Sequence, residues 1–183
     1  MGKLIGTVLI FGGCMGLLAR EMGLARQRIA QLHVLQEFFV HTAFELRNHG
    51  TDMGIYLQQI AQDVEETSGL SQKRALNVLQ ATCQKSVQYL EAYAFPSGAC
   101  AWEKACMDCK ENWRLNDREK RILQAFGEAA FGRFGEENVR KLEQLAQETS
   151  QCLTEAQKQL RQKQKVLAPA TMLGGALLCI LLV

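Results

Sequence analysis

The chain has one uncharged apolar segment near each end and a polar sequence with periodic apolar positions between them. Leu4 to Ala19 and Val166 to Val183 contain no charged residue. A helix rises about 1.5 Å per residue, so these segments reach roughly 24 to 27 Å, against a hydrocarbon core of about 30 Å. The pattern therefore predicts a transmembrane helix at each end. The long side chains of Lys3, Arg20 and Lys165 can reach the membrane surface and so compensate for the missing length.

Each apolar segment has an alternative interpretation. Lys3 followed by an apolar run is also typical of a cleaved signal peptide, although no small-x-small cleavage site follows the run. The last segment could instead be a buried core helix, but its uncharged sequence up to Val183 favours a membrane anchor. The first alternative, a cleaved N-terminal segment, stays open at this point.

The two apolar segments divide the chain into three predicted parts: an N-terminal anchor (1–22), a helical domain (23–165) and a C-terminal anchor (166–183). Basic residues flank the central domain, and only Lys3 and the amino terminus oppose them. By the positive-inside rule the central domain is predicted to be cytosolic, in a two-span membrane protein. The membrane-flanking basic residues are Arg20, Arg26, Arg28, Arg161, Lys163 and Lys165.

Between the anchors, apolar residues recur three or four positions apart, as on one face of an amphipathic helix. Breakers at Asn48-His49-Gly50, Thr67-Ser68-Gly69, Phe95-Pro96-Ser97-Gly98 and Phe131 to Gly135 separate the segments. The predicted helices cover 25–48, 53–66, 72–94, 99–113 and 117–130, with a sixth that begins near Glu136 and has no breaker before Pro169.

Capping residues predict where several of these helices begin. Thr51 or Asp52 starts the second helix, Ser71 the third, and Asn116 with Glu119 forms a capping-box pattern for the fifth. Two apolar stripes are predicted to face the core. They are Leu76, Leu79, Cys83, Val87 and Leu90 in the third helix, and Val139, Leu142, Leu145, Cys152, Leu153, Ala156 and Leu160 in the sixth.

Composition supports an all-α fold, because good helix formers dominate and proline occurs only twice. The net charge of +2 is too small to indicate a nucleic-acid partner, which needs a dense basic face. Seven cysteines, an odd number, fit no closed disulfide framework and favour a reducing compartment.

Candidate chemistry is confined to one cysteine motif. Cys106-x-x-Cys109, with Cys100 nearby, could bind zinc or cycle as a disulfide, but no second motif completes a four-ligand site. The histidines recur every eight residues, an advance of about 80° on a helix, so they cannot converge on one metal. No phosphate-binding or nucleophile-elbow motif is present. We therefore predict no catalytic residue, cofactor or metal ligand, and a non-enzymatic protein.

The chain resembles the stage III sporulation protein AB family along nearly its whole length. The matching segments are Phe44-Glu45-Leu46 with Gly50 and Leu57, Trp102 to Ala105, Leu115 to Asp117, Leu123 to Gly127, and the ending Leu173 to Val183. The resemblance implies an all-α helical bundle, similar to secretion-system platform proteins, between an N-terminal and a C-terminal transmembrane helix.

The same resemblance implies a membrane component of the channel-like complex that links mother cell and forespore during sporulation. Its implied partners are the secretion-type stage III sporulation ATPase, other membrane proteins of that complex and membrane lipid, in the mother-cell membrane; homo-oligomerisation is left open. The alternative function is a membrane-tethered thiol or zinc-dependent regulator that uses Cys100, Cys106 and Cys109. A further alternative is a two-span adaptor unrelated to sporulation.

Overall fold

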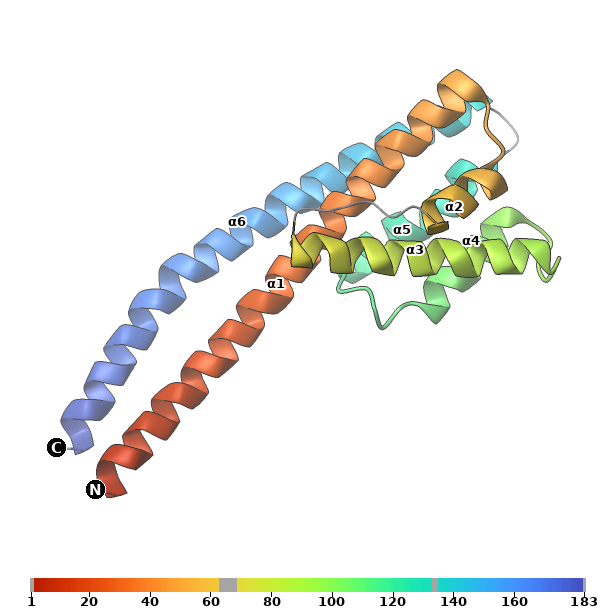
Figure 1. Ribbon diagram of the computed structural model, residues 1–183. Coiled ribbons are helices and arrows are strands. Elements are labelled where there is room, and N and C mark those ends of the chain that lie inside the picture. Colours follow the sequence, from red (N-terminus) through yellow and green to blue (C-terminus); the bar gives the residue numbers. More distant parts are fainter. Residues whose placement is uncertain (1, 63–68, 133–134, 183) are drawn as a thin grey trace. The chain divides into compact units, whose positions relative to one another are not determined.

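The computed structural model describes residues 2–62, 69–132 and 135–182, and over these ranges the chain is all-α, with no strand. Figure 1 shows the helices in chain order. They are α1 (Gly2–His49), α2 (Met53–Gln62), α3 (Leu70–Glu91), α4 (Gly98–Asp108), α5 (Asp117–Ala130) and α6 (Gly135–Leu182).

The chain divides into two compact units. Unit 1 combines the two chain ends, residues 1–26 and 155–183, and unit 2 comprises residues 27–154. Within unit 1, the outer parts of α1 and α6 run antiparallel (Figure 1). Unit 2 holds α2 to α5 and the inner parts of α1 and α6.

Each of the two long helices joins a predicted anchor to a helix of the predicted central domain. Both α1 and α6 extend over 48 residues without interruption, so the helix predicted to begin at residue 25 is the continuation of the N-terminal one. α6 likewise continues through Pro169. Across the described ranges, no helix combines the length and the mean hydropathy needed to cross a membrane.

An aromatic cluster forms the centre of unit 2. Phe38 of α1 stacks on Trp102 of α4 with ring centroids 6.1 Å apart and meets Phe126 of α5 at 4.7 Å. The ring of Trp102 lies 4.6 Å from that of Phe126, and its indole N–H donates to the carbonyl of Leu123 at 2.8 Å. Apolar packing and the hydrogen bond from the Trp102 indole N–H therefore join α1, α4 and α5.

Most predicted helix ends agree with the structure because they depend on local capping. The Asp52 carboxylate accepts the N–H groups of Gly54 and Ile55, at 2.8 and 3.2 Å, which confirms Asp52 rather than Thr51 as the start of α2. Gly50, at a φ of 55°, ends α1 in the left-handed conformation that favours glycine. Asn116 and Glu119 form the predicted capping box. The predicted end of α2 falls on residues 63–68, outside the described ranges.

Two local predictions were wrong, and a third was right only in part. The N-cap of α3 is Gly69, with no side-chain cap, because the helix already includes Ser71. α4 ends at Asp108 and not at Trp113. The buried side of α3 is formed by Ala75, Leu79, Thr82, Cys83 and Ser86, whereas Leu76, Val87 and Leu90 are only half-buried. Leu79 and Cys83 of the predicted stripe are therefore buried, and Ala75, Thr82 and Ser86, which the pattern did not include, complete the buried side.

The early end of α4 is explained by a buried side chain of α1. Gln31 donates from its amide to the carbonyl of Asn112 at 3.0 Å and accepts the N–H of Arg114 at 2.7 Å. It thereby satisfies backbone groups of the turn that follows α4, which would otherwise be costly to bury. The indole N–H of Trp113 donates to the Thr82 hydroxyl at 3.2 Å. This segment is therefore fixed by tertiary hydrogen bonds and not by helix propensity.

The predicted stripe of α6 is confirmed for its larger part. Val139, Leu142, Leu145, Cys152, Leu153 and Ala156 are buried, and Leu160 is half-buried.

Candidate partner-binding site

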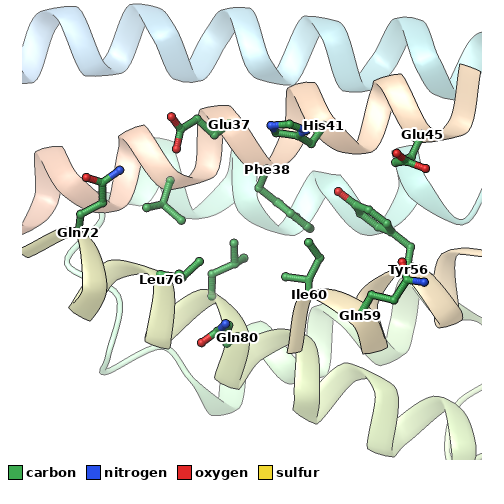
Figure 2. A pocket seen from close by; sticks show the side chains of 12 residues that line it. Glu37, Phe38, His41, Glu45, Tyr56, Gln59, Ile60, Gln72, Leu76 and Gln80 are labelled. Carbon is green, nitrogen blue, oxygen red and sulfur yellow. The ribbon is translucent and has the colours of Figure 1, made fainter. Parts of the chain in front are cut away.

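A groove within unit 2 is a candidate site. It lies between α1, α2 and α3 and has a volume of about 540 Å³. Figure 2 shows Glu37, His41 and Glu45 following one another along α1, with Gln72, Leu76 and Gln80 following α3 on the opposite side. The lining residues are Val34, Glu37, Phe38, His41, Glu45, Tyr56, Gln59, Ile60, Gln72, Leu76, Leu79 and Gln80.

The floor of the groove is apolar and is an extension of the core. Val34, Phe38, Tyr56 and Leu79 are buried there, and the rings of Phe38 and Tyr56 stack with centroids 6.5 Å apart. Burial raises the pKa of the Tyr56 hydroxyl, a hydrogen bond with Thr42 opposes that effect, and the nearby charge of Glu45 adds to it. The hydroxyl therefore stays protonated at neutral pH, and the floor is uncharged.

The rim of the groove has acidic and amide side chains. Glu37, His41 and Glu45 are spaced four residues apart on α1, which places them on one side of the helix over two turns, about 12 Å. The carboxylate of Glu37 lies 3.4 Å from the imidazole of His33. Among the described residues that line the groove there is no lysine or arginine. The rim therefore combines two negative charges with hydrogen-bonding amides.

The predicted membrane-flanking basic residues fall into two groups. Five of them belong to unit 1 and have exposed side chains: Arg20, Arg26, Arg161, Lys163 and Lys165. Arg28 belongs to unit 2 and is bound to a carboxylate of α5. Its guanidinium donates to Glu119 through Nε, at 3.1 Å to each carboxylate oxygen, and through Nη2 at 2.6 Å.

The Arg28–Glu119 pair is a structural feature that the sequence reasoning missed. The side chain of Glu119 has no exposed surface and that of Arg28 is 26% exposed. The same carboxylate accepts the backbone N–H of Asn116 at 2.8 Å, which completes the capping box. The Asn116-x-x-Glu119 pattern predicted only the capping role of Glu119. It did not predict the ion pair, because Arg28 lies 91 residues away in the sequence. Glu119 therefore links the start of α5 to α1.

The cysteines of the alternative function, Cys100, Cys106 and Cys109, differ in exposure. Cys83, Cys106 and Cys109 are buried, whereas Cys100 is exposed. Burial raises the pKa of the Cys83 and Cys106 thiols far above the ordinary value, so both stay protonated at neutral pH. Metal binding and nucleophilic attack both need the thiolate. In the described part of the chain, no group of three or more His, Cys, Asp or Glu side chains could hold a metal ion.

The three histidines, His33, His41 and His49, are all exposed on α1. His41 lines the groove, and the ring of His49 lies edge-on to that of Phe44, with centroids 6.4 Å apart. They are spread along the helix as their spacing predicts.

Over the described residues, these features define an all-α helical-bundle protein with an acid-rimmed groove. The chain matches the family described as Stage III sporulation protein AB over residues 3–183, and it belongs to that family. Proteins of this family are components of the sporulation complex.

A solved structure with the same fold is described as "Stage III sporulation protein AB (SpoIIIAB)". Its TM-score to this chain is 0.51 at 18% sequence identity, and the match covers 75% of this chain and 93% of the other. At this identity the similarity shows the fold alone. No curated protein matches the chain.

Proposed function

We propose that this protein is a non-enzymatic membrane component of the sporulation complex that links mother cell and forespore, and that it serves as a platform for a secretion-type ATPase. The observation that carries the proposal is the family match over residues 3–183. The acid-rimmed groove supports a role in protein–protein contact, because a groove with some apolar lining is a recurring binding site for a partner helix.

The proposal includes two membrane anchors, residues 1–22 and 166–183, around a cytosolic domain. The grouping of both chain ends, residues 1–26 and 155–183, into one compact unit supports this division. We expect the exposed basic residues of unit 1 to contact anionic lipid, which contributes about 1 kcal/mol for each charge near the membrane surface. The membrane is that of the mother cell.

The ATPase contact is tested by co-purification. Full-length protein is recovered from sporulating cells in a gentle detergent, and we expect the stage III sporulation ATPase to accompany it. The matched control is the same purification from cells that lack this protein. If the wild-type protein recovers no ATPase in repeated purifications under gentle conditions, the platform role is wrong.

Topology is tested on Cys100, which has the exposed thiol that labelling needs. A membrane-impermeant thiol reagent added to intact cells should leave Cys100 unmodified, whereas the same reagent added to opened cells should modify it. Mass spectrometry of the peptide that contains Cys100 gives the readout, and a Cys100→Ser variant identifies background signal. Rapid labelling in intact cells would place the central domain outside the cytosol and overturn the proposed orientation.

A further inference from the structure

The groove of unit 2 has a length, a charge and a floor that together restrict what can bind there. Its α1 side is lined from Val34 to Glu45 and its α3 side from Gln72 to Gln80. On the α3 side, Gln72 and Gln80 are eight positions apart, which corresponds to a rise of about 12 Å or roughly two helical turns. This length matches about two turns of an inserted helix. The described lining residues all lie on helices, so they offer no sheet edge to which an extended peptide could add.

The floor favours an apolar helix face. Phe38 and Ile60 point toward each other across the groove in Figure 2, and Val34, Leu76 and Leu79 complete the apolar lining. Ile60 and Leu76 are half-buried, so they still expose apolar surface that a partner could cover. An amphipathic helix can fit this floor, because its residues i, i+3 or i+4, and i+7 lie on one face and can all contact it.

The rim determines the charge of the partner. Glu37 and Glu45 are two helical turns apart, and no lysine or arginine among the described lining residues neutralises them. Glu37 is 53% exposed, and its one described ionic neighbour is the imidazole of His33, which is charged only when protonated. The other titratable group on this rim is His41, between the two carboxylates. A binding helix therefore gains most from cationic side chains at the same spacing of two turns.

We infer that the groove binds an amphipathic helix of a protein partner, whose apolar face covers Phe38, Ile60 and Leu76 and whose two basic residues, seven or eight positions apart, pair with Glu37 and Glu45. The inference rests on the proposed function in one respect, which is that the helix belongs to the ATPase. The chemistry of the contact depends only on the groove.

The inference is tested with a synthetic peptide and the full-length protein in a nonionic detergent. The peptide is an amphipathic helix of about 18 residues, with leucines along one face and two flanking lysines seven residues apart. Fluorescence anisotropy should show saturable binding that weakens as salt is added, because exposed ion pairs are screened. A peptide with glutamates in place of the lysines should bind at least tenfold more weakly.

The decisive variant is the charge reversal Glu37→Lys with Glu45→Lys, which should weaken binding of the lysine peptide about tenfold or more, since two attractions become repulsions. The matched control is Glu111→Lys with Glu128→Lys, which reverses two exposed carboxylates outside the groove and should leave the affinity unchanged. Unchanged circular dichroism shows that both variants are folded. If the groove variant binds the peptide as tightly as the wild type, or if no saturable binding is found, the inference is wrong.

Co-purification of the same variants separates this inference from the proposed function. If wild-type and groove-variant proteins recover the ATPase equally, the groove is not the contact and the platform role stands. If the wild type recovers no ATPase but binds the peptide in a manner that depends on Glu37 and Glu45, the groove inference stands and the platform role fails.

Discussion

Replacing Glu119 by alanine is expected to lower the free energy of unfolding by about 3–5 kcal/mol, as for removal of one partner of a buried ion pair. The substitution removes the ion pair between Glu119 and Arg28, and it removes the acceptor of the Asn116 N–H, which lies 2.8 Å from the Glu119 carboxylate. For a domain of this size the midpoint of thermal unfolding should fall by about 6–20 °C. Chemical denaturation of the full-length protein in nonionic detergent, followed by far-UV circular dichroism, gives the measurement.

The structure has a matched control for this prediction. Arg47 and Glu143 also form an ion pair with an N–O distance of 2.6 Å, but their side chains are 59% and 49% exposed. Because solvent and salt weaken such a pair, Glu143→Ala should change stability by at most about 1 kcal/mol. A loss from Glu119→Ala no larger than the loss from Glu143→Ala would show that the buried pair is not structurally important.

Replacing Trp102 by alanine is expected to lower the free energy of unfolding by about 3–5 kcal/mol, the usual cost of truncating a buried aromatic residue. Trp102 has no exposed surface and packs against Phe38 and Phe126. Its loss leaves a cavity between α1, α4 and α5. The backbone of Gly127 comes close to the indole, where an added Cβ would lie 3.1 Å from Cδ1, so little nearby side chain can move in to fill the space.

Two further variants separate the parts of this effect. Trp102→Phe keeps most of the aromatic volume but removes the N–H that donates to Leu123, so its cost should be smaller than that of alanine. Tyr93→Ala removes an aromatic side chain that is 92% exposed and should change stability by less than about 0.5 kcal/mol. If Trp102→Ala is no more destabilising than Tyr93→Ala in the same denaturation assay, the aromatic cluster is not the centre of the fold.

Much of the secondary structure of this protein was determined by its sequence alone. The capping box at Asn116, the cap at Asp52 and the end of α1 at Gly50 were correctly predicted. Each depends on hydrogen bonds or backbone conformation within about one turn of chain, so the residues that decide it are adjacent in the sequence. The buried stripe of α6 was also predictable, because helical periodicity alone places its residues on one face.

Tertiary structure decided which polar residues are buried and what each contacts. The sequence predicted only a capping role for Glu119 and no role for Gln31. Each is buried because its partner comes from a distant segment: Arg28 for Glu119, and the turn at Asn112 for Gln31. The sequence did not predict the groove either, because Glu37, Tyr56 and Leu76 line it from three different helices. Periodicity identifies the face of a helix that is apolar, but only the packing of all the helices determines which part of that face is covered and which remains open to a partner.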